Sequence, residues 1–436
     1  REILRDLFLR SGKLEKYFLA KLILRKLYFG YEYRSSFISE ILAQKYQTSK
    51  KIVENSIALS SIFDVARILQ YEGSDALKKM VLKPLNPVSP ALAGTNPPDE
   101  KAKFPLWIEC KYDGIRLMTH KETNPWGRVT YASFTRKKHD WLEIISGLEH
   151  SLSRIPAHSF IIDGELHGTI CDWEREGSRQ ATVYEVYHYL QGSSEFMVKL
   201  KYIAFDILYL NGQDITNLPL MHRRKLLEQL IMPLQQNMPQ DMPILLSYGS
   251  EVNNYSDIQR WYQYFVSQGH EGAIVKIPDS TYSLGNRTDD WMKKKKELHL
   301  DLVITGALWA TGEHGPQVFS TYILSCQTPE GLKEIGRAQG LSLQNNFEII
   351  NRIFNDNLLT GKTLDVRSSN AIKQGVQILP SIVVAVKFED VVKDSNDVYS
   401  LRDPKIICIR PKSDISPEEA DTYSTIRQMY MKKRLG

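Results

Sequence analysis

The chain has 436 residues, 42% of them hydrophobic and 25% charged, and its formal net charge is +5. This composition is that of a globular protein and excludes disordered, collagen-like and fibrous classes, and the length predicts about two to four domains. No apolar run approaches the roughly 18 residues of a membrane-spanning helix, and the first residues carry charges rather than a secretory signal. The four cysteines lack zinc-site spacing, which favours an intracellular, reducing compartment.

The first part of the chain, to about residue 80, is predicted to be helical. Leu4, Leu7 and Phe8 begin a series of apolar residues at three- and four-residue spacing, and proline is absent. Ser35 or Ser36 precedes another such series and is predicted to start a helix. Prolines then cluster between Pro84 and Pro105, which indicates a linker or an irregular strand.

From Leu106 the pattern becomes that of an α+β domain. Trp107–Cys110 and Ile115–His120 flank Asp113 and Gly114, and this arrangement predicts a β-hairpin. Strands mixed with helices follow along the chain. We expect strands at Phe160–Ile162, Tyr202–Leu210 and Ala273–Ile277, and helices at His222–Ile231 and Asp257–Gln268.

After Leu298 the sequence is again rich in strand patterns. Short apolar or alternating runs, with one helix and one loop between them, predict a small barrel, for which an oligonucleotide-binding barrel is one candidate. The expected strands are Leu302–Leu308, Phe319–Cys326 and Ile382–Phe388, the helix is Asn345–Phe354, and the loop is Gly312–Gly315.

The candidate catalytic and binding residues lie in six sequence segments, which are separated by distances typical of a domain. P-loop, dinucleotide-binding and H-E-x-x-H patterns are absent from the sequence. Glu109–Arg116 contains a K-x-D-G pattern, which is weak alone, but chance agreement of all the segments in this order is remote. The segments are Glu109–Arg116, Phe160–Glu165, Tyr202–Asp206, Glu271–Lys276, Trp291–Lys296 and Ser400–Arg410.

With these segments the chain resembles the ATP-dependent DNA ligases of the covalent nucleotidyltransferase superfamily, in their three-domain form. The resemblance runs from about Ser11 to the C-terminus and is strongest from Trp107 to Lys296. Arg25–Gly30 and Leu82–Leu85 resemble the end of the family's helical DNA-binding domain, which looks truncated here. The implied multidomain α+β fold has an all-α DNA-binding domain at 1–84, an ATP-grasp-like nucleotidyltransferase domain at 85–298 and an OB-fold β-barrel at 299–436.

The resemblance implies that Lys111 attacks ATP and becomes lysyl-AMP. A lysine nucleophile needs its pKa lowered from about 10.4, by burial or by nearby cations. Glu165 and Glu271 are the implied ligands of Mg²⁺ or Mn²⁺, a pairing that suits magnesium shared with substrate phosphates. The implied ATP and AMP contacts are Glu109, Arg116, Arg136, Glu165, Phe205, Lys276, Lys293, Lys295, Arg402, Lys405 and Arg410.

Individual residues have competing interpretations. Phe205 is expected to stack on adenine, but it shares a strand face with apolar neighbours, so a core role competes. Lys293 and Lys295 should share one strand face, with Lys294 on the other. Asp163 is interpreted as a turn former rather than a ligand.

Three features depart from the family pattern. Arg136 is retained but is followed by Lys137, where the family usually has asparagine. An acidic residue, Asp403, follows Arg402 in the last motif. The segment Thr169–Gly192 differs from the better-known members.

The expected function is sealing of nicked double-stranded DNA by a monomer, in the nucleus of a eukaryote or the cytoplasm of a prokaryote. Backbone contacts would make DNA binding independent of sequence and strongly dependent on salt. The alternatives are an RNA ligase, an mRNA capping guanylyltransferase and a degenerate DNA-binding scaffold. The helical N-terminal segment favours a DNA ligase, and the absence of a zinc-binding cysteine cluster disfavours an NAD-dependent one.

Overall fold

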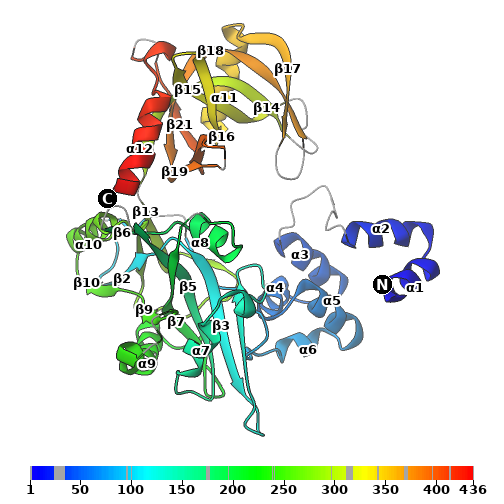
Figure 1. Cartoon of the computed structure of the whole chain (residues 1–436). Coiled ribbons are helices and arrows are strands. Elements are labelled where there is room, and N and C mark those ends of the chain that lie inside the picture. Colours follow the sequence, from blue (N-terminus) through cyan, green and yellow to red (C-terminus); the bar gives the residue numbers. More distant parts are fainter. Residues whose placement is uncertain are drawn as a thin grey trace.

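The computed structural model has a mixed α/β architecture in which a helical segment, a unit built on two sheets and a β-barrel follow one another (Figure 1). It describes residues 2–23, 35–94, 97–99, 101–172, 177–194, 196–237, 239, 241–295, 297–310, 318–340, 343–367, 372–394, 396–411 and 414–435. Among these residues, none of the helices has the length and apolar character needed to cross a bilayer.

The N-terminal part is helical, as the spacing of its apolar residues predicts. The helices are α1 (Glu2–Arg10), α2 (Lys13–Ile23), α3 (Ser35–Lys45), α4 (Lys50–Leu59), α5 (Ile62–Tyr71) and α6 (Ser74–Lys78). Helix α3 begins at Ser35, and Val53, Val65 and Leu69 are buried between the helices. The predicted family feature at Arg25–Gly30 lies outside the described residues.

A half-buried lysine attaches this helical part to the rest of the chain. The Lys138 ammonium donates to the carbonyl oxygens of Ile57, at 3.0 Å, and of Ser60, at the C-terminal end of α4. The Ile57 carbonyl also accepts from the Ser60 amide, at 3.4 Å, and carbonyl oxygens at the end of a helix attract a cation. Burial lowers the pKa of Lys138 to about 8.

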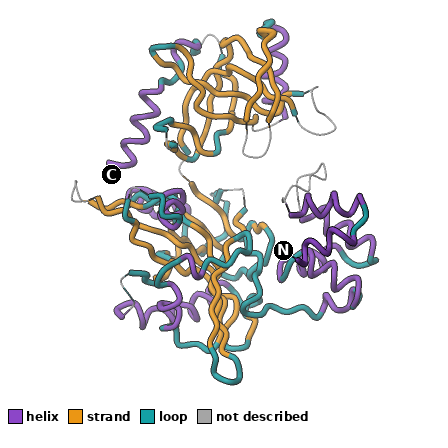
Figure 2. The backbone as a smooth tube through the Cα atoms, turned by 45° about the vertical axis from the view of Figure 1, so that its right-hand side comes forward, coloured by secondary structure: helices purple, strands orange, loops and turns teal. Residues whose placement is uncertain are grey.

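The central unit consists of two sheets with helices outside them (Figure 2). Within the described residues, one sheet has the order β10-β2-β11-β13, and the other has the order β4-β3-β5-β7-β8 with β6 on β5 and β9 on β7. The strands of the first sheet are β2 (Leu106–Lys111), β10 (Gly249–Val252), β11 (Gly272–Lys276) and β13 (Trp291–Lys295). Those of the second are β3 (Ile115–Thr123), β4 (Val129–Thr135), β5 (Ser159–Asp172), β6 (Gly177–Gln180), β7 (Val198–Leu210), β8 (Gln213–Asp214) and β9 (Ile244–Leu246).

The helices of this unit cover the sheets from outside, and two short strands pair beside them. The helices are α7 (Leu148–Ser153), α8 (Val183–Leu190), α9 (Leu220–Ile231) and α10 (Tyr255–Ser267), and the short strands are β1 (Leu92–Ala93) and β12 (Arg287–Thr288). Helices α9 and α10 correspond to the two helices predicted from the sequence.

The predicted hairpin at Asp113 and Gly114 is wrong. Strand β2 pairs with β10 and β11, whereas β3 pairs with β4 and β5, so this turn carries the chain from one sheet to the other. Its glycine serves close packing, because a Cβ on Gly114 would lie 2.3 Å from the Leu166 carbonyl oxygen. The local pattern could not reveal that β2 finds its partners much later in the sequence.

The segment Thr169–Gly192, which departs from the family pattern, forms the end of β5, strand β6 and helix α8. Thr182 and Glu185 form a capping box at the start of α8. Its residue Tyr184 lies under the guanidinium of Arg402 from the C-terminal part, with the Arg402 Cζ 5.5 Å from the ring centroid. This segment therefore lies where the central unit meets the barrel.

In the C-terminal part the strand pairings close on themselves. Strand β14 pairs with β15 and β18, and β21 joins β16 to β18, so the described strands complete a barrel with β17 added at β18. The elements are β14 (Leu298–Trp309), β15 (Phe319–Thr328), β16 (Gly331–Gly340), α11 (Leu343–Asn355), β17 (Leu359–Arg367), β18 (Ile372–Phe388), β19 (Asp390–Lys393), β20 (Tyr399–Arg402), β21 (Lys405–Ile409) and α12 (Tyr423–Leu435). The predicted loop Gly312–Gly315 lies outside the described residues, and the oligonucleotide-binding assignment stays a prediction.

Candidate active site

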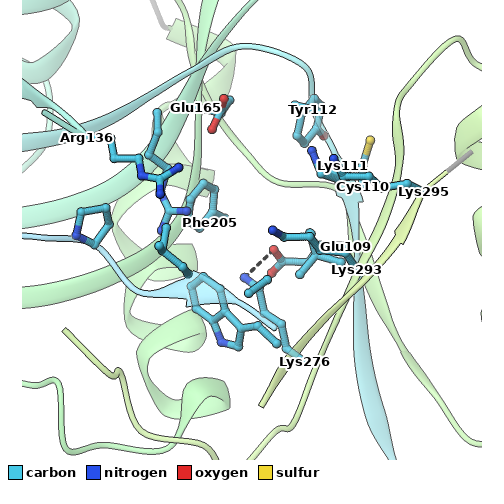
Figure 3. Close-up of a pocket in the computed structure, with 16 residues that line it drawn as sticks. Glu109, Cys110, Lys111, Tyr112, Arg136, Glu165, Phe205, Lys276, Lys293 and Lys295 are labelled. Carbon is cyan, nitrogen blue, oxygen red and sulfur yellow. Dashed lines mark hydrogen bonds and ion pairs between the residues drawn. The ribbon is translucent and has the colours of Figure 1, made fainter. Parts of the chain in front are cut away.

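A cavity of about 220 Å³ lies between the two sheets of the central unit (Figure 3). Strands β2, β11 and β13 of the first sheet supply one side, and β3, β5 and β7 of the second supply the other. Among the predicted site residues, those that line it are Glu109, Lys111, Arg116, Arg136, Glu165, Phe205, Lys276, Lys293 and Lys295. The fold thus collects side chains from segments that are far apart in the sequence.

Strand geometry aims the lysines. Lys293 and Lys295 occupy alternate positions of β13, opposite Ile274 and Gly272 of β11, and both line the cavity. Lys294 lies on the other face, where its Nζ is 5.0 Å from the centroid of the Tyr262 ring on α10. The predicted separation of these lysines by strand face is therefore seen in the structure.

One end of the cavity is closed by a buried ion pair. The Lys276 ammonium donates to the Glu109 carboxylate at 2.7 Å, and their side chains are only 2% and 3% exposed. Trp107 Nε1 also donates to Glu109, at 2.7 Å. The Lys276 Nζ lies 4.4 Å from the Trp291 ring centroid and 5.0 Å from that of Phe205. We call this group the base end, because aromatic rings and a fixed donor–acceptor pair suit a nucleobase.

Lys276 lies far from Lys111, the residue that the resemblance implies as nucleophile. In the pairing of β2 with β11, Lys111 lies opposite Gly272, four positions from Lys276. At about 3.3 Å per residue this is a separation of about 13 Å along the strand. The Lys276 ammonium is paired with Glu109, so it belongs to the base end and not to the surroundings of Lys111.

At the other end of the cavity, ion pairs link Lys111 to the barrel. Glu271 pairs with Lys111 and, at 3.0 Å, with Lys295. Lys295 also pairs with Glu389 of the barrel, at 2.5 Å. Glu389 lies 3.7 Å from Arg402. We call this group the phosphate end.

The same series of ion pairs also reaches Asp113, in the turn that follows Lys111. Arg402 Nη1 lies 3.3 Å from an Asp113 carboxylate oxygen, two residues after Lys111. A barrel arginine is therefore held at the mouth of the central unit, and the carboxylates between these cations occupy positions that suit phosphate oxygens.

The phosphate end is crowded with positive charge. Burial, together with the charges of Arg287, Lys295 and Lys111, lowers the pKa of Lys293 to about 8. Attack on a phosphate needs Lys111 as a neutral amine, so its pair with Glu271 must open first. Anionic phosphates entering the cavity would compensate both lysines.

The carboxylate of Glu165 has the character expected of a ligand for a cation. Burial raises its pKa to about 8, against the opposing charges of Arg116 and Lys111. No hydrogen bond or ion pair within the described residues satisfies it, whereas Glu271 is already engaged by two lysines. Glu165 therefore fits a divalent cation shared with phosphates, or a sugar hydroxyl, while no cluster of three acidic, histidine or cysteine ligands occurs among the described residues.

Asp163 is not a turn former, and this prediction is wrong. It lies inside β5, fully buried, and accepts from Arg116 Nε at 2.7 Å and Nη2 at 2.6 Å. The glycine after it exists for packing, because a Cβ on Gly164 would lie 2.5 Å from Cζ of Tyr202. Asp206, beside Phe205, is likewise buried in a pair with Arg223, at 2.8 Å. The Asp-Gly pair resembles turn chemistry, so the sequence carried no signal for this role.

Four predicted site residues do not line this cavity. Glu271 and Arg402 line a neighbouring hollow together with Asp113 and Glu389, whereas the other two pair elsewhere on the barrel. Lys405 pairs with Asp403 at 3.2 Å, and Arg410 pairs with Asp301 at 2.8 Å. The unexpected acidic residue of the last motif therefore faces Lys405 rather than the cavity. Pro90, Leu92 and Ala93 line the cavity without having been predicted, since irregular segments carry no periodic signal.

The cavity defines a nucleotide-binding protein of the mixed α/β class, with a lysine among cations at one end and aromatic rings at the other. The family model described as "ATP dependent DNA ligase domain" matches residues 80–295. DNA ligase 2 of Methanosarcina mazei is 27% identical, over 98% of this chain and 73% of that protein. The DNA ligase of Natronomonas pharaonis is also 27% identical, over 98% of this chain and 74% of that protein.

A solved structure called "Pmar-Lig_Pre." is similar to 94% of this chain and 98% of its own, with a TM-score of 0.55 and 15% identity, and it bears on the fold alone. The chain belongs to the ATP-dependent DNA ligase family.

Proposed function

We propose that this protein seals nicks between a 5′-phosphate and a 3′-hydroxyl in duplex DNA, with ATP as the source of AMP. The observation that carries the proposal is Lys111 at a cavity where Lys293, Lys295 and Arg116 converge from two sheets. The family match over residues 80–295 supports it. We divide the chain into a helical DNA-binding domain at 1–84, a nucleotidyltransferase domain at 85–298 and an oligonucleotide-binding barrel at 299–436.

In the first step the Lys111 amine attacks the α-phosphate. A nitrogen–phosphorus bond forms, the bond to the β-phosphate oxygen breaks, and pyrophosphate leaves. Lys293 and Lys295 offset the charge that develops on the α-phosphate, and Arg402 faces the leaving group. Glu271 separates from Lys111 and Lys295 when phosphate oxygens of ATP replace its carboxylate as their partner. Phe205 and Glu109 hold the base.

A divalent cation, Mg²⁺ or Mn²⁺, would be held by Glu165 and phosphate oxygens and would supply charge neutralisation. Glu271 would become a further ligand of this cation only after separating from Lys111 and Lys295. In the second step AMP passes from Lys111 to the 5′-phosphate of the nick. In the third, the 3′-hydroxyl attacks that phosphate and AMP leaves.

The partner is nicked double-stranded DNA, bound as a monomer through its backbone. The helical part and the barrel flank the central unit (Figure 1), so each can supply cations to the duplex. Lys405 and Arg410, which lie outside the cavity, are candidates for such contacts or for phosphate contacts after the barrel moves. We place the enzyme inside the cell.

The decisive experiment weighs the intact protein after incubation with ATP and Mg²⁺. We expect the mass of one AMP to be added, and Lys111→Ala to abolish the adduct and nick sealing while binding of nicked duplex persists. Lys294→Ala is the matched control, because this lysine lies on the outer strand face. An adduct with GTP alone would favour a capping guanylyltransferase, and DNA binding without any adduct would favour a non-catalytic scaffold.

A further inference from the structure

A buried tyrosine stands behind one of the cavity arginines. We propose that Tyr282 is a positioning residue for Arg116, which it holds both directly and through Asp163. The inference rests on the proposed function, since Arg116 is taken to contact the bound nucleotide.

Arg116 is held on two of its three nitrogens. Nε and Nη2 donate to the two oxygens of Asp163, at 2.7 and 2.6 Å, and Nη2 also donates to the Ala91 carbonyl, at 3.2 Å. Nη1 alone has no hydrogen bond among the residues that the structure describes. The Arg116 Cζ lies 4.7 Å from the Phe205 ring centroid. The guanidinium is therefore fixed against the proposed base platform with one edge left for a ligand.

The Tyr282 hydroxyl joins the groups that fix this arginine. It donates to Asp163, accepts from the Ala91 amide at 3.1 Å, and lies 3.5 Å from Arg116 Nη2. Tyr282 is 5% exposed, so its hydroxyl has no water to replace these partners. Without it, both Asp163 and the Ala91 amide would lose a partner, and Arg116 would gain freedom to tilt.

The surrounding charges make this restraint necessary. Asp163 of β5 lies directly opposite Asp206 of β7, so two buried carboxylates are neighbours. Each has its own arginine, and the Arg223 Cζ lies 5.7 Å from the centroid of the Tyr282 ring. Tyr282 therefore contacts both arginines, with its ring facing Arg223 and its hydroxyl beside Arg116 and Asp163.

The position of Tyr282 in the chain explains what the contact achieves. It follows β11, whose last residue is Lys276 of the base end, whereas Arg116 belongs to β3 of the other sheet. Its backbone amide is also fixed, by donation to the Thr216 carbonyl at 2.8 Å. Tyr282 thus ties the segment between β11 and β13 of the first sheet to an arginine of the second, behind the cavity wall.

The test compares Tyr282→Phe with Tyr202→Phe. Tyr202 is the matched control, because it is fully buried and its hydroxyl accepts from Thr119 and donates to the carbonyls of Leu117 and Ile162. It thus contacts the chain neighbours of Arg116 and Asp163 but neither of their side chains. The measurement is the single-turnover rate of lysyl-AMP formation against ATP concentration, with the melting temperature of each variant. We expect Tyr282→Phe to raise the ATP concentration for half-maximal rate about 5-fold or more. Tyr202→Phe should leave it within about 2-fold despite a similar loss of thermal stability.

A second background isolates the route through Arg116. In Arg116→Met, adding Tyr282→Phe should change the half-maximal ATP concentration no further, because the group it positions is gone. An equal shift in both backgrounds, or equal behaviour of the two tyrosine variants, would overturn the inference. If wild-type protein forms no lysyl-AMP, the proposed function fails, and calorimetric titration with ATP then compares the same variants for nucleotide affinity.

Discussion

The two ends of the cavity hold similar ion pairs in opposite environments. At the base end, Lys276 and Glu109 are almost completely buried and are packed by Trp107 and Trp291. At the phosphate end, Lys295 and Glu389 are each 26% exposed, and every cation of the group has a partner that belongs to another element. The same chemistry is therefore permanent at one end and exchangeable at the other.

The difference follows from solvent. A buried charge that loses its partner has no water to replace it, so the base-end pair persists when ligands come and go. A partly exposed carboxylate can leave its lysine at little cost, and a phosphate can take its place. The base-end pair therefore keeps a fixed geometry, whereas the ion pairs of the phosphate end can be exchanged for phosphate contacts.

The largest effect is expected from breaking the base-end pair. Lys276→Met leaves the buried Glu109 carboxylate with Arg224, 3.6 Å away, as its remaining cation, and should reduce the free energy of unfolding by about 3 kcal/mol. Urea denaturation measures it, with Lys294→Met as the control, since Lys294 lies on the outer strand face against the half-buried rings of Tyr255 and Tyr262. The double variant with Glu109→Gln should recover part of the loss. A loss below about 1 kcal/mol for Lys276→Met would remove the distinction between the two ends.

The second prediction concerns pH at the phosphate end. With its pKa lowered to about 8, Lys293 is charged below that pH and loses its proton as pH rises through it. ATP affinity should therefore fall about 10-fold between pH 7 and pH 9 through this group.

Lys293→Arg keeps the charge at both pH values and should flatten this part of the profile. Arg287, Lys295, Lys111 and Glu271 act on Lys293, and Glu165 titrates nearby, so only the difference between the two proteins is diagnostic. Parallel profiles for wild type and Lys293→Arg would contradict the prediction.

The smallest effect is expected at Glu389. Its carboxylate sits between Lys295 and Arg402, two cations assigned to phosphates. Glu389→Gln removes a competitor, so ATP should bind about 2- to 5-fold more tightly. Glu297→Gln is the control, because it removes an exposed carboxylate that pairs with Lys387 at 3.0 Å. Weaker ATP binding by Glu389→Gln would show that Glu389 positions the cations rather than competing for them.

The sequence alone indicated most of the charged and aromatic residues that line the cavity, and the strand face that two of its lysines share. Lys293 and Lys295 share a face because side chains alternate along a strand, and the predicted apolar series after Ser35 lies in helix α3. Such signals are local. The order of the six motifs along the chain adds the family resemblance, which composition alone does not give.

Only the tertiary structure decided which charges meet. Asp113 and Gly114 look like a hairpin but join two sheets, and Asp163 looks like a turn but holds Arg116. Lys276 forms an ion pair with Glu109, and Lys295 forms one with Glu389 of the barrel. Pairing across sheets and between distant segments depends on long-range packing, which no local pattern records.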